Sequence, residues 1–123
     1  MRNIWVRPAV RKAVFLAYAL AVLALAVYPF QETVGSSNDK INHVLAFIAF
    51  YGLAVWSHQR ARPVPVIIWG LAYGGLIEFI QSFVPYRQCS LGDLAADAVG
   101  LMIGMIVWAL YRKWFRRNGL ESE

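Results

Sequence analysis

Residues 76–97 read LIEFIQSFVPYRQCSLGDLAAD, and this stretch decides the fold because it places polar side chains at the ends of two apolar segments. These side chains are Glu78, Gln81, Arg87, Asp93 and Asp97. A charged side chain at the centre of a bilayer costs about 2.5–3.5 kcal/mol on insertion scales, so charged residues in a spanning segment generally mark a function or a partner. We therefore expect the rest of the chain to be arranged around this polar stretch.

The composition is that of an integral membrane protein. Of the 123 residues, 59% are hydrophobic and 15% are charged, and a soluble domain of this size would expose much of that apolar surface. The formal net charge is +5. The basic residues lie at segment ends and are not interleaved with aromatic residues, so we interpret them as topology signals and predict no nucleic-acid partner. The single cysteine, Cys89, excludes an internal disulfide framework and a Cys-rich metal site.

Four apolar segments predict an all-α, integral membrane four-helix bundle that forms one domain over residues 1–123. The spans are expected at about residues 13–30, 41–57, 64–84 and 91–111. At about 1.5 Å per residue, each crosses most of the roughly 30 Å hydrocarbon core. The first span also fits a secretory signal peptide, because it has a basic start and contains Ala24-Leu25-Ala26. Its length and its aromatic end favour a retained span.

The distribution of charge predicts the orientation of the bundle. If the amino terminus is inside, ten of the twelve Lys and Arg residues lie at cytoplasmic ends: Arg2, Arg7, Arg11, Lys12, Arg60, Arg62, Arg112, Lys113, Arg116 and Arg117. Only Lys40 and Arg87 then fall outside, together with most of the acidic residues. By the positive-inside rule we expect both termini in the cytoplasm (N-in/C-in).

Helical spacing predicts that the polar side chains share faces near the outer end of the bundle. Three pairs have such a spacing: Asp39 with His43, Glu78 with Gln81, and Asp93 with Asp97. Glu78 and Asp97 come about 10 Å below the ends of their spans, at 1.5 Å per residue. That depth favours the bundle interior or a wet cleft over lipid. Lys40, His43 and Arg87 are the expected cationic or hydrogen-bonding partners.

Small residues continue two of these faces into the bundle. Gly70 and Gly74 lie on the third span and Gly100 and Gly104 on the fourth, each pair four residues apart and in line with the acidic residues of its span. Glycines at this spacing let helix backbones approach closely. We therefore predict that spans three and four pack along these two stripes.

Several short motifs follow one another in a fixed order: Asp39-Lys40-x-x-His43 with Phe47, Ile77-Glu78-x-x-Gln81, Val84-Pro85-x-Arg87, Ser90-x-x-Asp93 and Gly100-x-x-x-Gly104. This order resembles the VanZ-like family of small membrane proteins, which is named for a protein linked to teicoplanin resistance. The resemblance covers residues 39–104. It implies a multi-pass protein of the bacterial cytoplasmic membrane with a role in the cell envelope or in glycopeptide antibiotic resistance, but no established activity. One departure is Asp97, where the family more often has Asn, so the resemblance assigns no charge-dependent role there.

The first functional hypothesis is a binding protein. An outward-facing polar cleft, formed by spans two to four, would bind an envelope-related ligand that is lipid-linked or glycopeptide-like. Lys40 and Arg87 would contact an anionic group. Glu78, Gln81 and Asp97 would accept hydrogen bonds from amines or hydroxyls, and Asp93 completes the ligand-binding set. Asp93 also suits a simpler role, because negative charge is favoured near a helix N-terminus.

The second hypothesis is an intramembrane hydrolase or transferase that acts on such a substrate. His43 or Glu78 would be the general base, and neighbouring carboxylates would orient that base or hold a divalent metal. The sequence contains no HExxH or GxSxG motif. It leaves the metal, and any other cofactor, undetermined. The simpler alternative for His43 is a core histidine that is hydrogen-bonded to Asp39 or to a backbone carbonyl.

The composition itself implies membrane lipid as a partner. Two further functional hypotheses remain. The first is a permeation role, which would need a homo-oligomer, because the inner halves of the spans contain almost no polar residues to line a path. A purely structural role would make the polar cluster a set of salt bridges that hold the bundle together.

Overall fold

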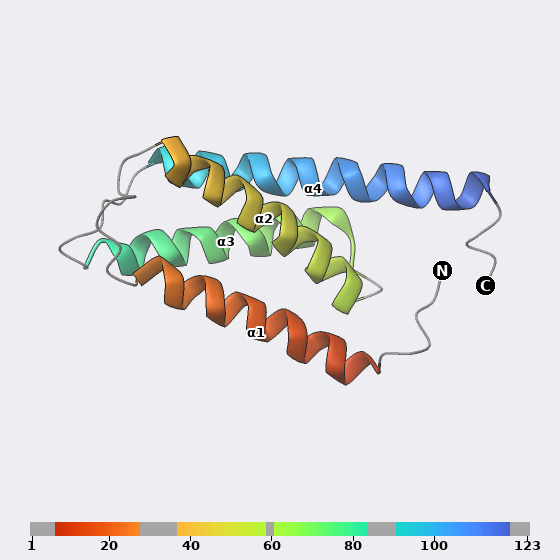
Figure 1. Ribbon diagram of the computed structural model, residues 1–123, viewed down its shortest axis with the longest axis horizontal. Helices are drawn as coiled ribbons and strands as arrows, with labels where there is room; N and C mark the ends of the chain where they lie inside the picture. Colours follow the sequence, from red (N-terminus) through yellow and green to blue (C-terminus); the bar gives the residue numbers. More distant parts are fainter. Residues whose placement is uncertain (1–6, 28–36, 59–60, 84–90, 119–123) are drawn as a thin grey trace.

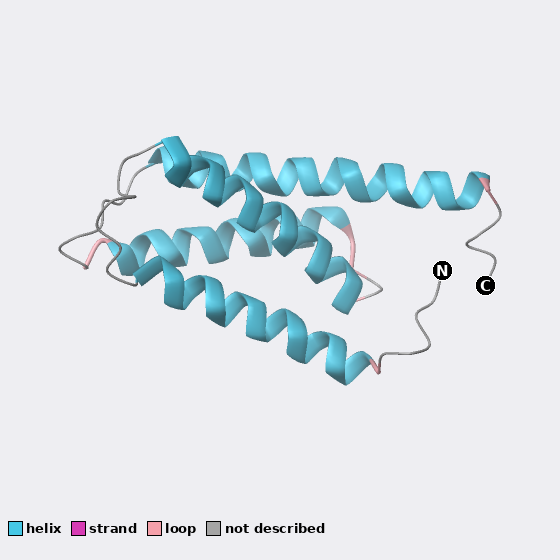
Figure 2. Cartoon of the chain, in the orientation of Figure 1, coloured by secondary structure: helices cyan, strands magenta, loops and turns pink. Residues whose placement is uncertain are grey.

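The computed structural model of the chain describes residues 7–27, 37–58, 61–83 and 91–118. Within these ranges it contains no strand and four α-helices: α1 (Pro8–Val27), α2 (Ser37–Ser57), α3 (Pro63–Gln81) and α4 (Leu91–Arg117) (Figures 1 and 2). All four helices are long and apolar enough to cross a membrane. The predicted all-α membrane bundle is confirmed, while the N-in/C-in orientation stays a prediction.

The helix bounds differ from the expected spans at several ends. α1 begins at Pro8 and not near residue 13, because proline is well tolerated in the first turn of a helix, where its missing N–H has no partner to lose. α4 continues past Tyr111 to Arg117. Its last turn contains Arg116 and Arg117, whose charges complement the negative end of the helix dipole. α3 ends at Gln81, before the expected end near residue 84, and Ser82 and Phe83 form a turn after it. The expected end near residue 30 lies outside the described residues.

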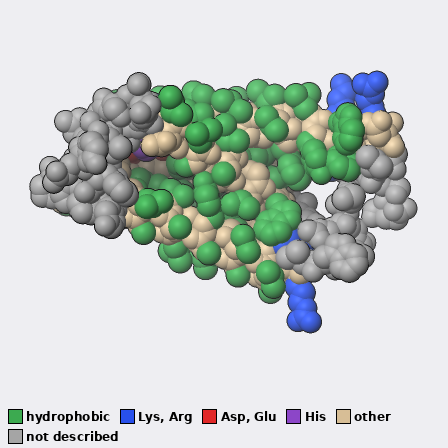
Figure 3. All heavy atoms as spheres, in the orientation of Figure 1, with side chains coloured by type: hydrophobic (Ala, Val, Ile, Leu, Met, Phe, Trp, Pro, Cys, Tyr) green, Lys and Arg blue, Asp and Glu red, His purple; other side chains and the backbone are tan. Residues whose placement is uncertain are grey.

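The four helices alternate in direction, so α2 and α4 run parallel to each other (Figure 1). We call the end of the bundle at which α2 and α4 begin the polar end, and the opposite end, at which α1 begins and α4 ends, the basic end. Figure 3 shows hydrophobic side chains over the middle of the visible face, with the visible Lys and Arg side chains at the basic end. This is the pattern of a bundle whose sides face hydrocarbon and whose ends face water.

Among the described residues, α2 and α4 share the most extensive contact between two helices. A Cβ atom added to Gly100 would lie 2.4 Å from the carbonyl oxygen of Val44, and one added to Gly104 would lie 2.7 Å from the Cβ of Tyr51. Side chains do not tolerate such short contacts, so only glycine allows the two backbones to come this close. The glycines of α4 therefore face α2, and the prediction that they face α3 is wrong.

The glycines of α3 do face α4. Gly70 lies against Leu101 of α4, and Gly74 lies against Asp97. The reason for the difference is that α4 packs on two helices at once. Its glycine stripe meets α2, and the side chains of the neighbouring stripe, Asp97 and Leu101, fill the space beside α3. Spacing along the sequence identifies a stripe, but it does not identify the helix that the stripe meets.

Aromatic rings join the first three helices in the centre of the bundle. The ring of Phe50 in α2 lies 5.2 Å from that of Phe15 in α1 and 5.4 Å from that of Tyr73 in α3, measured between ring centroids. The hydroxyl group of Tyr73 also donates a hydrogen bond to the carbonyl oxygen of Ala19 in α1. Aromatic pairs of this kind contribute about 0.5–1.5 kcal/mol beyond the area that they bury. They therefore help to hold α1, which is otherwise largely exposed, against the bundle.

Substituting Gly100→Ala tests the α2–α4 contact. The new methyl group would meet the backbone of α2, which cannot rotate away as a side chain can, so we expect the free energy of unfolding to fall by about 1–3 kcal/mol. The control is Gly52→Ala, because nothing lies within 4 Å of a Cβ at Gly52. Denaturation of both variants in mixed detergent micelles measures the difference. Equal stability of the two variants would contradict the close packing of α2 on α4.

Candidate functional site

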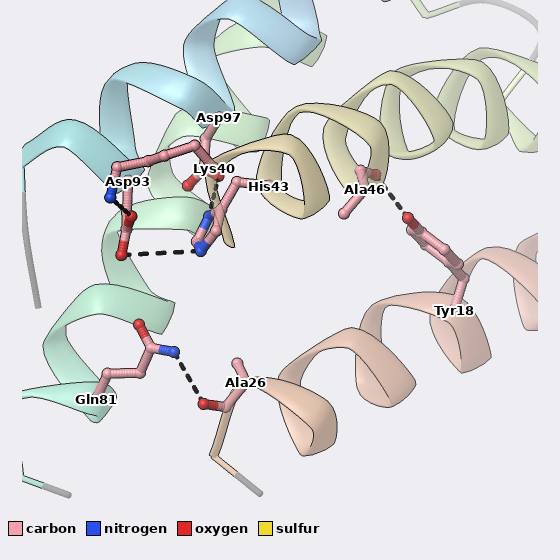
Figure 4. Close-up of polar contacts among 8 residues, drawn as sticks. All are labelled: Tyr18, Ala26, Lys40, His43, Ala46, Gln81, Asp93 and Asp97. Carbon is pink, nitrogen blue, oxygen red and sulfur yellow. Dashed lines mark hydrogen bonds and ion pairs between the residues drawn. The ribbon is translucent and has the colours of Figure 1, made fainter. Parts of the chain in front are cut away.

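Six polar side chains from three helices converge at the polar end. They are Lys40 and His43 of α2, Glu78 and Gln81 of α3, and Asp93 and Asp97 of α4, and we call them the polar cluster. Figure 4 shows five of them, with the side chains of α2 turned toward those of α4. The four residues contributed by α3 and α4 are buried. These six are the predicted catalytic and ligand-binding residues within the described part of the chain; Arg87 and the side chain of Asp39 lie outside it.

His43 and Asp97 form the most deeply buried contact of the cluster. The Nδ1 atom of His43 lies 2.7 Å from Oδ1 of Asp97, and the Asp97 side chain is 0% exposed. An ionised carboxylate only accepts hydrogen bonds, so a bond to it places the imidazole proton on Nδ1. Nε2, which carries the lone pair in this tautomer, then lies on the other side of the ring. The hydrogen bond from Nδ1 to the buried carboxylate of Asp97 thus fixes the orientation of the imidazole.

Asp93 lies on the opposite side of the imidazole and bridges to the surface of the bundle. Its Oδ1 atom accepts a hydrogen bond from the ammonium group of Lys40, and its Oδ2 atom lies 3.8 Å from Nε2 of His43. Asp93 is in the first turn of α4, where the helix dipole favours negative charge. The side chain of Lys40 is 43% exposed and that of Asp93 only 4%. The ion pair therefore connects the buried cluster to the solvent-facing rim.

Glu78 and Gln81 complete the cluster from α3. Glu78 is 5% exposed, and one of its carboxylate oxygens, with a ring nitrogen of His43 and a carboxylate oxygen of Asp93, falls in a group whose atoms all lie within 4.8 Å of one another. The Nε2 atom of Gln81 donates a hydrogen bond to the carbonyl oxygen of Ala26, at 2.8 Å. A carbonyl can only accept, so the amide oxygen of Gln81 must face the other way. Figure 4 shows this oxygen on the side of Asp93.

Sequence reasoning missed two contributions to the site. The first is Ala26, whose carbonyl near the described end of α1 accepts a hydrogen bond from Gln81 and orients its side chain. The second is Gly74, which we expected only to pack helices. A Cβ atom at Gly74 would lie 2.5 Å from Oδ2 of Asp97, so the missing side chain makes room for the buried carboxylate. No pattern in the sequence marks a backbone acceptor, although the alignment of Gly74 with Glu78 placed it on the correct face.

A separate apolar cavity of about 500 Å³ lies between α1, α2 and α3, toward the basic end. Its lining includes Phe15, Phe50, Trp69 and Tyr73. His58 also borders it and contacts the hydroxyl oxygen of Ser57 through Nδ1, at 2.7 Å. The chain thus has its two histidines at opposite ends, one in the polar cluster and one beside an apolar cavity.

Substituting Gly74→Ala tests the space that Asp97 occupies. The added methyl group would displace the Asp97 carboxylate, so we expect His43 to lose its hydrogen bond through Nδ1 and the bundle to lose about 1–3 kcal/mol of stability. Nitrogen-15 NMR of the imidazole, recorded in detergent micelles, reports which ring nitrogen carries the proton. Gly75→Ala is the matched control, because a Cβ at Gly75 meets nothing within 4 Å. An unchanged imidazole spectrum in the Gly74→Ala protein would contradict this arrangement.

Comparison with known proteins places the chain among relatives. The sequence profile of a family described as VanZ/LLP1 matches residues 15–112. The uncharacterized protein C11E3.10 of Schizosaccharomyces pombe is 31% identical over 111 residues, which cover 85% of this chain and 68% of the yeast protein. No solved structure matches. The four helices and the family together make this a multi-pass membrane protein, and the yeast relative shows that similar chains are not confined to bacteria. As its motifs predicted, the chain belongs to the VanZ/LLP1 family.

Proposed function

We propose that this protein binds the polar head of an amphipathic, lipid-linked ligand of the cell envelope at its polar end. The observation that carries the proposal is the buried set of acceptors: the carboxylates of Glu78, Asp93 and Asp97 and the amide oxygen of Gln81. Each carboxylate oxygen and the amide oxygen can accept more than one hydrogen bond. A head group rich in hydroxyl or amine donors, such as an amino sugar or a peptide amine, supplies the donors that such a set of acceptors binds.

The location of the cluster supports an amphipathic ligand over a soluble one. The polar cluster lies at one end of four membrane-spanning helices, so a ligand with its head in the cluster has its hydrocarbon chain beside the apolar sides of the bundle. In the proposed orientation the polar end faces the outside, because the Lys and Arg residues at the basic end belong in the cytoplasm. This is the outer leaflet of the cytoplasmic membrane in a bacterium, where glycopeptide-like and cell-wall ligands are found.

Lys40 has a narrower role here than the sequence hypothesis assigned to it. Because it already pairs with Asp93, it does not add a full positive charge to the site. Its partly exposed ammonium group can still contact a phosphate at the membrane surface while it keeps its bond to Asp93. Arg87, outside the described residues, remains the second cation proposed for this anionic group.

The binding proposal is tested by native mass spectrometry of the purified protein with three lipids: a polyprenyl phosphate, a polyprenyl diphosphate that carries an amino sugar, and phosphatidylglycerol. We expect preferential binding of the sugar-bearing lipid. Glu78→Gln, which keeps the shape of the side chain but removes its charge, is expected to weaken that binding at least tenfold, because a hydrogen bond to a charged group contributes about 1.5–3 kcal/mol. Ser82→Ala, at an exposed position of the same end, is the control.

Equal binding of all three lipids, or equal binding by the wild type and the Glu78→Gln protein, would refute a head-group site in the polar cluster. The measurement includes a chelator throughout, so that its outcome does not depend on any metal ion.

One observation favours the alternative, an intramembrane hydrolase or transferase. The imidazole of His43 has a buried carboxylate, Asp97, on Nδ1, the carboxylate of Asp93 at 3.8 Å from Nε2, and the carboxylate of Glu78 in the same group of atoms. A carboxylate that accepts a hydrogen bond from one ring nitrogen of a histidine favours the tautomer whose other nitrogen can accept a proton. That tautomer suits a general base.

The enzymatic alternative predicts turnover of the sugar-bearing lipid. Wild-type protein in lipid nanodiscs would release a water-soluble head group, detected by mass spectrometry, and His43→Gln would lower the rate at least a hundredfold, in line with the usual contribution of a general base. His58→Gln, at the other end of the bundle, would leave the rate unchanged. Binding without turnover would reject the enzyme and retain the binding protein.

A further inference from the structure

We propose that His43, Glu78 and Asp93 bind a divalent metal ion, with the amide oxygen of Gln81 as a neighbouring ligand. This deepens the proposed function, since it concerns the same cluster and rests on that cluster being the ligand site. The inference stands on three features: the spacing of the donor atoms, the orientation of the imidazole, and the direction of the glutamine amide.

The donor atoms are close enough to share one ion. A nitrogen of His43 and one carboxylate oxygen from each of Glu78 and Asp93 lie within 4.8 Å of one another. Nε2 of His43 and Oδ2 of Asp93 are 3.8 Å apart, which is too long for a hydrogen bond. Ligands at about 2.0–2.2 Å from a common ion lie roughly 3–3.5 Å apart. Small rotations of the side chains therefore suffice to close the site around an ion.

The imidazole is oriented as a metal ligand requires. In metal sites the histidine generally donates its second ring N–H to a carboxylate, which fixes the tautomer and strengthens the ligand nitrogen. Asp97 is such a carboxylate: it contacts Nδ1 of His43 at 2.7 Å, lies within α4, and is fully buried. Nε2 then lies on the side of Asp93, 3.8 Å from its Oδ2 atom, and a carboxylate oxygen of Glu78 belongs to the same group of donor atoms. Asp97 orients this ligand and does not itself need to touch the ion.

Gln81 provides an observation that is independent of the acidic residues. The residue is 4% exposed, and its Oε1 atom has no hydrogen-bond partner among the described residues. Its amide nitrogen is committed to the carbonyl of Ala26, so the oxygen faces the cluster and cannot be exchanged with the nitrogen by a flip of the amide (Figure 4). A carbonyl oxygen without a proton donor is suited to a cation.

The donor set selects the class of ion. One imidazole nitrogen with two carboxylates and an amide oxygen suits first-row divalent ions such as Mn²⁺ and Zn²⁺, whereas Ca²⁺ and Mg²⁺ prefer sites made of oxygen alone. Bound at this position, the ion would attract a phosphate oxygen of the lipid-linked ligand toward an otherwise acidic cluster. Because a coordinated Nε2 has no lone pair to accept a proton, the proposal assigns His43 the role of ligand and not of base.

The test uses the full-length protein, purified in detergent, freed of its affinity tag and treated with a chelator that is then removed. Mn²⁺ is titrated into this protein without any lipid and followed by electron paramagnetic resonance, and Zn²⁺, Mg²⁺ and Ca²⁺ are added as competitors. We expect one Mn²⁺ per chain, displaced by Zn²⁺ more readily than by Mg²⁺ or Ca²⁺. Pulsed measurements should detect coupling of the bound ion to one imidazole nitrogen.

Variants assign the ligands. His43→Ala and Glu78→Gln should each weaken binding at least tenfold, and the nitrogen coupling should disappear in His43→Ala. Asp97→Asn should weaken binding about tenfold to a hundredfold through the orientation of His43. The matched control is His58→Ala, which removes the other histidine of the chain and should leave affinity and nitrogen coupling unchanged.

The result that would overturn the proposal is a folded wild-type protein that binds no stoichiometric Mn²⁺ or Zn²⁺, or a bound ion without nitrogen coupling or with coupling that is lost in His58→Ala. These readouts come from the wild type and a control at the far end of the bundle, so they hold even if a cluster variant does not fold. Failure here, with lipid binding intact in the presence of chelator, would reject the metal and keep the proposed function. Metal binding without selective lipid binding would keep the metal site and reject the proposed lipid-binding function.

Discussion

The contact between the buried carboxylate of Asp97 and the imidazole of His43 is the constraint on which the rest of the polar end depends. A fully buried carboxylate in a membrane-spanning helix is costly unless hydrogen-bond donors surround it, and α4 can supply none at that depth. The donor therefore comes from α2, at 2.7 Å. Space for the second carboxylate oxygen comes from α3, where Gly74 has no side chain to occupy it. Asp97 thus contacts both neighbouring helices, α2 through His43 and α3 at Gly74.

The direction of the helices explains why acidic residues accumulate at this end. α2 and α4 are parallel and both begin there, so the positive ends of two helix dipoles lie side by side. Asp93 benefits directly, since it lies in the first turn of α4. Parallel dipoles repel each other, and the cost is offset by the tight contact of Gly100 and Gly104 with α2. The same geometry that brings the backbones together also brings Lys40 and His43 of α2 within reach of the acids of α4.

Within the described residues, α1 contributes a backbone carbonyl and no charged side chain to the site. Its last turn offers the carbonyl of Ala26 to Gln81, and hydrogen bonds from Tyr18 and Tyr73 link its middle to α2 and α3. Hydrogen bonds between helices in a membrane contribute about 0.6 kcal/mol each on average, so several are needed to hold a helix that buries little surface. α1 therefore sets the orientation of Gln81, although it is the helix farthest in sequence from the acidic residues. Binding of a cation or of a donor-rich head group would depend on that orientation.

The sequence by itself determined the class of the protein, its family, the existence of four spans and the helix faces on which the polar residues lie. These follow from composition, hydropathy and spacing, which are properties of each segment alone. Only the tertiary structure decided that His43 pairs with Asp97, 54 residues away, that the glycines of α4 meet α2, and that Ala26 orients Gln81. Those outcomes depend on the rotation of each helix about its axis and on its choice of neighbours. In an apolar bundle that rotation is decided by the packing of all the helices together, because nearly every face of each helix is hydrophobic enough to meet either lipid or protein.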